Sequence, residues 1–309
     1  MDVLCIGLAG YDLIFALPEY PREDSKFQTG APGAPGAFSA SGGGPAANAA
    51  CLLSRWGLQC ALACVLGEDP WGERTRTELE EAGTDLSLVE TRSETATPLS
   101  CVWVSRESGS RTIVNHRPPG APLRLEPSAL RSRRQPKLLL MDGHEAEASL
   151  MAMRAWPQAV TVLDAGSRRR GTEILAERVD YLAASAQFAL EVTGVEDLER
   201  AEGQDECLRR LQKLACGQVV VTLGHRGLIT LENGGLRRLP AFPVRAVDTT
   251  AAGDVFHGAF AYCLVSGLPL AESLRFASAA AALSTTRPGG RAAIPSHGEV
   301  EDFLAKGEY

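Results

Sequence analysis

Apolar and polar positions along this chain follow two different patterns. Near-continuous apolar runs occur at 3–8, 137–143, 159–166, 181–185 and 218–224. Such runs are typical of strands that are buried on both faces of a parallel sheet. Segments with helical character lie between them, at 45–56, 70–83, 145–155, 187–191 with its continuation, and 203–215. This alternation predicts an α/β fold with a doubly wound sheet.

Two segments depart from this alternation. The runs at 98–105 and 112–116 alternate apolar and polar residues around a polar Gly-Ser turn, which predicts a β-hairpin and indicates a lid. Residues 28–45 are rich in Gly, Ala, Pro and Ser, a composition that excludes a regular helix or a core strand. They form either a flexible linker or a loop over a site, and they lie too near the N-terminus to join two domains.

Composition and charge exclude several classes of protein. With 45% hydrophobic and 22% charged residues among 309, the chain can bury a large core. A net charge of −7, with no long basic block, argues against nucleic acid as a partner. No apolar run approaches the roughly 20 residues that span a bilayer. The first residues resemble a strand, not a signal peptide, and the eight scattered cysteines lack zinc-site spacing. We therefore expect a cytoplasmic protein with reduced thiols and no membrane partner.

A run of glycines precedes the helix expected from residue 45. Gly43 and Gly44 allow the backbone to come close to a ligand, and a helix N-terminus offers unpaired N–H groups. Asn48 is a polar side chain in the first turn of an otherwise apolar helix. It is either an ordinary solvated residue or a hydrogen-bonding group for a polyol, and the pattern does not decide between them.

A second glycine-containing turn, 222–227, follows a buried strand. By itself this segment could be a simple β-turn between two strands. Ligands of open α/β sheets, however, bind at the carboxyl ends of the strands. Thr222 and Gly224 are therefore candidate neighbours of a nucleotide.

The segment 246–258 carries the strongest chemical signal. Asp248 and Asp254 flank a turn of small residues, and an apolar stripe with helical spacing follows. Backbone N–H groups of residues 251–253 at the helix entrance would stabilise an anion. Asp254 is then either a helix cap, worth about 1 kcal/mol, or a general base for a hydroxyl that attacks a phosphoryl group.

Three motifs in order carry a resemblance to a known family. They are Gly43-Gly44 with Asn48, the G-x-D-x-x-G element of Gly67, Asp69 and Gly72, and the "DTTAAGD" segment at 248–254. Together with the strand-end turn at 222–227, they resemble the PfkB (ribokinase-like) family of carbohydrate kinases over essentially the whole chain. The resemblance implies a ribokinase-like, Rossmann-type three-layer α/β sandwich over 1–309. It also implies a small β-sheet lid from about 11–41 and 96–118, through which two copies form a homodimer.

The resemblance also implies a reaction and its residues. ATP would donate its γ-phosphoryl group to a sugar hydroxyl, with Mg²⁺ as the metal. Asp254 would be the general base, and Ala251, Ala252, Gly253 and Asp254 would form the anion hole. Thr222, Gly224 and Gly227 would lie beside the nucleotide, and Asp12, Gly43, Gly44 and Asn48 beside the sugar. A monovalent cation such as K⁺ near Asp248 and Thr250 is common in relatives.

Two positions differ from the family pattern. Ala251 stands where relatives carry the first glycine of the anion hole, and alanine keeps its N–H, so the hole survives if this residue needs no positive φ. Ser185 and Phe188 stand where the magnesium-linked N-x-x-E element has Asn and Glu. Neither replaces a carboxylate, so we expect phosphates and water, not the protein, to hold magnesium.

The acceptor sugar is less well defined. The C-terminal third looks like 6-deoxy-6-sulfofructose kinases, and 20–26, 109–116 and 142–149 look like ketohexokinases. Lys26 and Asn115 match two sulfonate contacts of the former, but His144 replaces an Arg and lacks its bidentate fork. We therefore expect a ketose or furanose-type sugar. The alternatives are a nucleoside kinase on the same fold and a catalytically silent sugar-binding regulatory protein.

Overall fold

The structure, a computed structural model, describes residues 1–20, 22–24, 38–107, 109–232 and 234–307. Its larger sheet contains β1 (Val3–Ile6), β4 (Cys60–Gly67), β5 (Asp85–Arg92), β8 (Leu138–Met141), β9 (Val160–Ala165), β10 (Tyr181–Ser185), β11 (Gln218–Thr222), β12 (Leu228–Glu232) and β13 (Gly235–Leu239). Their order is β13-β12-β11-β10-β9-β8-β1-β4-β5. The strands are parallel except that β12 pairs antiparallel with β11 and with β13.

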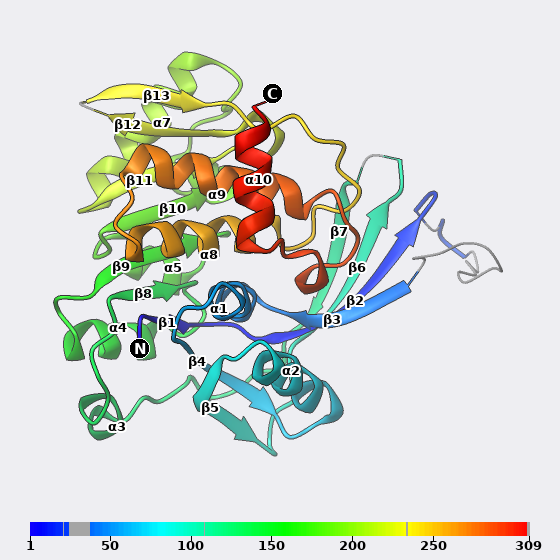
Figure 1. Cartoon of the computed structure of the whole chain (residues 1–309), viewed down its shortest axis with the longest axis vertical. Coiled ribbons are helices and arrows are strands. Elements are labelled where there is room, and N and C mark those ends of the chain that lie inside the picture. The colour runs from blue at the N-terminus through cyan, green and yellow to red at the C-terminus, as the bar shows by residue number, and fades with distance from the viewer. Residues whose placement is uncertain (21, 25–37, 108, 233, 308–309) are drawn as a thin grey trace.

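Helices cover both faces of this sheet (Figure 1). One face packs against α1 (Pro45–Arg55), α2 (Pro70–Glu81), α8 (Ala252–Val265), α9 (Leu270–Ser284) and α10 (His297–Lys306), with the short 3₁₀ turn η2 (Arg291–Ala293) near the lid. The other face packs against α3 (Pro127–Arg131), α4 (Ala146–Ala155), α5 (Arg170–Ala176), α6 (Ala186–Thr193) and α7 (Ala201–Leu214). A 3₁₀ turn, η1 (Gly224–Arg226), follows β11. Among the described residues, no helix is both long and apolar enough to span a bilayer.

The apolar runs arise because consecutive residues of a strand face different cores. In β1, Val3 and Cys5 pack in the cluster on the α1 and α8 face, whereas Leu4 and Ile6 pack in the cluster on the opposite face. All four side chains are completely buried. A strand between two helical layers therefore carries no polar alternation. The predicted α/β fold class is confirmed.

A second sheet of four strands forms the lid. Its strands are β2 (Gly10–Leu17), β3 (Phe38–Gly43), β6 (Leu99–Ser105) and β7 (Arg111–His116), in the order β3-β2-β6-β7. The β6–β7 pair is antiparallel, as the hairpin prediction requires. Figure 1 shows this sheet projecting from one side of the larger one. The four strands fall in or next to the predicted lid ranges of 11–41 and 96–118. That the whole chain forms a single domain stays a prediction.

The linker interpretation of residues 28–45 is wrong for its C-terminal part. Residues 38–43 form β3, which pairs antiparallel with β2 from Phe38 opposite Phe15 to Gly43 opposite Gly10. An edge strand needs hydrogen bonds to one neighbour only, so small and polar residues are tolerated there. Residues 25–37 lie outside the described part of the chain.

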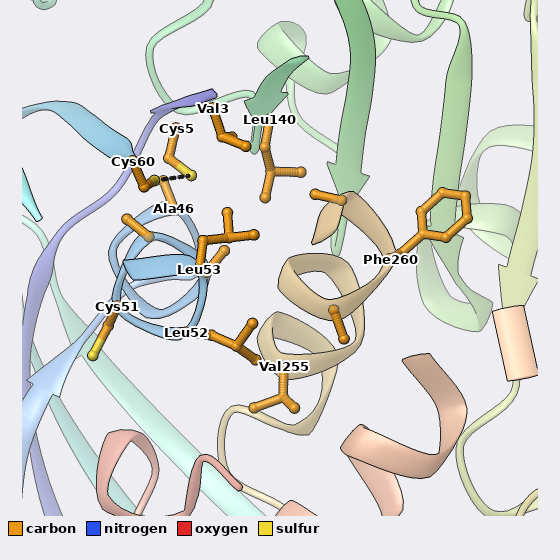
Figure 2. Packing of buried hydrophobic residues seen from close by; sticks show 14 of the residues in the cluster. Val3, Cys5, Ala46, Cys51, Leu52, Leu53, Cys60, Leu140, Val255 and Phe260 are labelled. Carbon is orange, nitrogen blue, oxygen red and sulfur yellow. Dashed lines mark hydrogen bonds between the residues drawn. The ribbon is translucent and has the colours of Figure 1, made fainter. Parts of the chain in front are cut away.

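Helices α1 and α8 pack closely at the centre of one core. Figure 2 shows Leu52 of α1 pointing toward Val255 of α8. Further along α8, a Cβ added to Gly258 would lie 3.2 Å from the Cα of Ala49. Two small residues thus allow the helix backbones to approach, which brings the first turns of both helices together.

In the same core Sγ of Cys5 lies 3.8 Å from Sγ of Cys60, and all eight cysteines of the chain are free thiols.

Candidate active site

Asp254 lies in the first turn of α8, directly opposite Asn48 of α1. The Asn48 amide Nδ2 donates a hydrogen bond to Oδ2 of Asp254 at 2.7 Å. The N-cap residue of α8 is Ala251, and its cap position has no side-chain hydrogen bond. Asp254 is therefore not a helix cap. Its carboxylate lies beside the positive end of the helix dipole and the N–H groups of the first turn, where an anion is stabilised.

The backbone of Ala251 has the conformation in which glycine is favoured. Its φ is 60° and its ψ is 8°, in the left-handed region. A non-glycine residue pays about 1–2 kcal/mol for this conformation because its Cβ approaches the following carbonyl. The residue still supplies its N–H to the helix entrance. Alanine at this position therefore strains the turn without removing a backbone donor.

The environment of Asp254 favours its neutral form. Burial raises the pKa of Asp254 to about 7, and the nearby Asp164 carboxylate contributes to the rise, while Asn48, His257 and Arg111 oppose it. Behind it, Nδ1 of His257 lies 2.9 Å from Oδ2 of Asp164, and both of these side chains are buried. A carboxylate with a pKa near neutrality is suited to accept a proton from a hydroxyl group.

A cavity of about 460 Å³ opens on the side of α8 that faces β11 and β12. The three nucleotide candidates, Thr222, Gly224 and Gly227, line it together with Ala252 and Gly253 of the helix entrance. The structure thus brings together two sequence motifs about 30 residues apart, at the carboxyl end of a strand where ligands of this fold class bind. The rest of the lining is largely apolar, with Leu228, Ala241, Phe242, Pro243, Val244, Ala246, Phe256, Ala281 and Ala282.

Gly227 is required at this cavity by its geometry. Its φ is +88°, and a Cβ at this position would lie 2.0 Å from the carbonyl oxygen of Leu239. No other residue fits without moving the β13 backbone. The glycine therefore fixes the shape of one wall of the cavity.

Arg111 of the lid reaches the opposite wall and was not among the residues selected from the sequence. Its Nη1 donates to the backbone carbonyl of Thr249 at 2.9 Å and to the Thr249 hydroxyl at 2.8 Å. Thr249 lies two residues before Ala251. The contact places the Arg111 guanidinium group between the lid and the entrance of α8. Arg111 also lines the cavity.

The sugar candidates of the lid meet on adjacent strands. Asp12 on β2 is paired in register with Ser100 on β6, which is paired with Asn115 on β7. A Cβ at Gly43 would lie 2.3 Å from Oδ2 of Asp12, so the carboxylate requires glycine there. Burial raises the pKa of Asp12, although a hydrogen bond with Ser100 and the positive charge of Arg291 act to lower it. Gly44, the next glycine along the chain, is the N-cap residue of α1 and has a φ of 94°. Lys26, another candidate for sugar binding, lies outside the described residues.

His144 lies in a cationic cluster around Asp142, which also accepts the N–H of Ala46 in the first turn of α1. Arg117 Nη1 lies 2.5 Å from Nε2 of His144, and the histidine Nδ1 lies 3.0 Å from Oδ1 of Asp142. Because a guanidinium can only donate, Nε2 accepts and the proton resides on Nδ1, which faces the carboxylate. Arg169 Nη1 donates to the Asp142 carbonyl at 3.0 Å. The histidine is thus accompanied by two arginines that no periodic signal in the sequence reveals.

Ser185 and Phe188, which stand where the family's N-x-x-E element has Asn and Glu, have structural roles. The Ser185 hydroxyl accepts the Phe188 N–H at 3.0 Å and so caps α6, while Phe188 is 1% exposed in the core. Within the described ranges there is no group of three or more His, Cys, Asp or Glu side chains suited to a metal ion.

The segment around Asp248 has oxygen atoms that could serve a monovalent cation. Asp248 accepts the N–H of Thr250 at 2.8 Å and that of Gly289 at 2.9 Å. The Thr250 hydroxyl is buried and has no hydrogen-bond partner among the described residues. A buried hydroxyl oxygen beside a carboxylate fits an oxygen-coordinated cation.

The chain is similar to known proteins over most of its length. A family model described as pfkB family carbohydrate kinase matches residues 1–297. A ribokinase of Haemophilus influenzae is 28% identical over 269 residues, covering 85% of this chain and 87% of the relative. Fructokinase-1 of Zea mays is 29% identical over 300 residues, covering 88% and 91%. The solved structure of Arabidopsis thaliana ribokinase complexed with ribose and ATP has a TM-score of 0.80 at 22% identity, covering 98% of each chain.

Proposed function

The chain belongs to the pfkB family of carbohydrate kinases, and from that premise we propose that it phosphorylates a hydroxyl of a ketose or furanose-type sugar. It is an ATP-dependent sugar kinase, a phosphotransferase with an alcohol group as acceptor. The observation that carries the finer proposal is the position of Asp254. The carboxylate lies at the helix entrance that borders the 460 Å³ cavity and contacts Asn48, one of the sugar candidates.

The proposed reaction uses this arrangement. The acceptor hydroxyl oxygen forms a bond to the γ-phosphorus of ATP, its proton moves to Asp254, and the bond to the β,γ-bridging oxygen breaks to release ADP. Backbone N–H groups of 251–254 hold the transferred phosphoryl group. Asp12, Gly43, Gly44 and Asn48 bind the sugar, and Thr222, Gly224 and Gly227 bind the nucleotide. Mg²⁺ held by phosphates and water would neutralise phosphate charge.

A K⁺ ion beside Asp248 and Thr250 is the second ion of the proposal. The support is the buried Thr250 hydroxyl without a partner in the described part of the chain. Its oxygen and the Asp248 carboxylate would supply ligands at the turn that precedes α8. Such an ion would fix the turn from which the anion hole begins.

The names of the relatives support a ketose or furanose acceptor. One relative is a ribokinase and the other a fructokinase, not a 6-deoxy-6-sulfofructose kinase or a ketohexokinase as the sequence segments suggest, and the sugars in their names form five-membered rings. A specific observation favours a second candidate, a ketose with a sulfonate or phosphate group. Arg117 and Arg169 surround His144, and they supply the guanidinium groups that His144 itself lacks.

We also propose a homodimer that forms through the lid. The support is apolar surface on its two edge strands: Phe38 on β3 is 53% exposed, and Ile113 and Val114 on β7 are 41% and 56% exposed. Unpaired sheet edges with apolar side chains favour association. Light scattering after gel filtration measures the mass, and Val114→Lys is expected to produce monomers.

A coupled ADP-release assay tests the proposed function. The acceptor panel contains fructose, tagatose, ribose, sulfofructose, phosphorylated hexoses and nucleosides. We expect the highest kcat/KM with a ketose or furanose sugar. The highest value with adenosine or inosine would instead identify a nucleoside kinase. Ligand-dependent thermal stabilisation without any ADP release would identify a silent binding protein.

A further inference from the structure

Arg291 in η2 is a buried charge with an unusual set of partners. It is only 1% exposed, and its Nη1 lies 3.1 Å from Oε2 of Glu78 on α2. The same carboxylate oxygen accepts the N–H of Gly42 at 2.8 Å. A guanidinium remains charged at every relevant pH, so its burial requires such a partner. Glu78 therefore holds Arg291 beneath the β3 strand.

The opposite edge of the guanidinium contacts the sugar candidates. Nε donates to Oδ1 of Asn48 at 3.2 Å, and Nη2 lies 3.4 Å from the carbonyl oxygen of Gly43. A Cβ at Gly42 would lie 2.0 Å from Nη1, so the guanidinium is in close contact with the β3 backbone. Arg291 thus joins α2, β3 and α1 directly below the predicted sugar site.

These contacts determine the orientation of the Asn48 amide. A guanidinium can only donate, so the Asn48 oxygen must face Arg291. The Asn48 NH₂ group then points the other way, where it donates to Asp254 at 2.7 Å. The flipped amide would place its NH₂ group against the guanidinium and its oxygen against the carboxylate. Both of those contacts are repulsive.

We propose that Arg291 is a positioning residue of the phosphoryl-transfer site: held by Glu78, it fixes the Asn48 amide so that the amide donates to Asp254. The assignment of a catalytic effect rests on the proposed role of Asp254 as the base, whereas the orientation of the amide does not. Without Arg291, the Asn48 amide no longer has a preferred orientation. The ionised form of Asp254 then loses the hydrogen bond that the Asn48 NH₂ group donates.

A purely structural role predicts a different outcome. The Arg291–Glu78 pair, with Arg55 Nη1 donating to the Arg291 carbonyl at 3.1 Å, also ties the C-terminal segment to the core. If that were its whole effect, loss of the Arg291 contacts with the positive charge retained would lower thermal stability and leave the titration of Asp254 unchanged. The two roles therefore separate in the pKa of Asp254 when it is measured in variants that retain the positive charge, Arg291→Lys and Gly42→Ala.

Other charged groups around Asp254 are the same in all the variants below. They are Asp164 of β9, His257 of α8 and Arg111 of β7. Around Arg291 the charged neighbours are Glu78 of α2, Arg55 of α1 and Asp12 of β2. Removing the positive charge of Arg291 also acts on Asp254 through space, so Arg291→Lys serves as a variant that retains charge.

The first experiment needs no substrate. Carbon-13 NMR of Asp-labelled apoprotein, with the Asp254 signal assigned by Asp254→Asn, measures the pKa of Asp254 in each variant. We expect the pKa to rise by about 1 in Arg291→Met, because a hydrogen bond to a charged group is lost. Arg291→Lys should give most of this rise, because a lysine cannot contact Glu78 and Asn48 at the same time.

Two further variants complete the design. Gly42→Ala displaces the guanidinium without removing it and should raise the pKa in the same direction, which keeps the test valid if Arg291→Met fails to fold. The matched control is Arg92→Met. Arg92 is also buried, with Nε 2.7 Å from Oε1 of Glu90, but it lies away from the site. Its loss should lower the melting temperature and leave the pKa of Asp254 unchanged.

The second experiment measures catalysis. In Arg291→Met, kcat/KM for the acceptor is expected to fall about tenfold at pH values below the wild-type pKa of Asp254, and less at higher pH. In an Asn48→Ala background, the same change should have little further effect, because Arg291 acts through Asn48.

The possible results separate the two proposals. An unchanged pKa of Asp254 in folded Arg291→Met and Gly42→Ala would overturn the positioning role, whatever the activity. Additive losses in the Asn48→Ala background would overturn it as well. A raised pKa together with no sugar-dependent ATP turnover in the wild-type protein would leave the positioning role intact and contradict the proposed function instead.

Discussion

Replacing Asp254 by Asn should stabilise the fold while it lowers activity by about 10²–10⁴-fold. Asp254 has a pKa of about 7 in the folded protein, whereas an unfolded Asp has a pKa of about 3.9. Below pH 4 the carboxyl is protonated in both states. As the pH rises toward 7, the unfolded chain releases the proton and the folded protein retains it, so Asp254 lowers stability increasingly across this interval. Asparagine carries no charge and has no such effect.

The magnitude follows from the difference between the two pKa values. About three pKa units correspond to an upper limit of about 4 kcal/mol. Asp254 is partly exposed, so solvent screening reduces this figure, and we expect Asp254→Asn to gain about 1–2 kcal/mol at pH 8. For a protein of this size, the gain corresponds to a melting temperature higher by about 2–3 °C. The gain should disappear near pH 4.

Thermal unfolding of the apoprotein between pH 4 and 8 measures this effect. The control is Asp69→Asn. Asp69 caps α2 by accepting the N–H groups of Trp71 and Gly72, and its pKa is lowered by hydrogen bonds from backbone N–H groups that outweigh its burial. That substitution should therefore reduce stability above pH 4. A melting temperature of Asp254→Asn below the wild-type value at pH 8, or a difference that does not depend on pH, would refute the reasoning.

Three further predictions concern the turn, the cavity and the cationic cluster. Ala251→Gly relieves the left-handed strain and, after the greater entropy loss of glycine, should stabilise the protein by about 0.5–1 kcal/mol in thermal melts. Gly227→Ala places a Cβ against the Leu239 carbonyl and should weaken ATP binding at least tenfold by calorimetry; unchanged affinity would contradict the cavity assignment. Arg117→Ala and Arg169→Ala should each raise KM about tenfold for an acceptor with a sulfonate or phosphate group, and leave KM for fructose nearly unchanged.

The sequence is sufficient for the features that depend on local pattern. The runs at 137–143 and 218–224 predict β8 and β11 because strands between two helical layers are continuously apolar. The turn at 222–227 and the motif at 248–254 each indicate a ligand, and both line the same cavity. The composition of 28–45 does not indicate the strand at 38–43, most of which the lid range of 11–41 includes, because its pairing with β2, not its composition, stabilises it.

Contacts between distant residues could not be predicted in this way. Asn48 and Asp254 were selected separately, but nothing local indicates that they contact each other across 206 positions. Arg291 and Glu78 are 213 positions apart, and each looks like an ordinary charged residue in its own segment. The left-handed backbone of Ala251 was also not predictable, because alanine rarely adopts it and the turn imposes it.

The central claim is that Asp254 accepts the proton from the sugar hydroxyl during transfer from ATP. The most direct measurement is the pH profile of kcat/KM for the best acceptor, for wild type and Asp254→Asn, with ATP affinity measured in parallel. We expect a wild-type activity that falls below about pH 7, and a loss of about 10²–10⁴-fold in Asp254→Asn with ATP affinity retained. Substantial activity in Asp254→Asn with an unchanged acidic limb would contradict the claim.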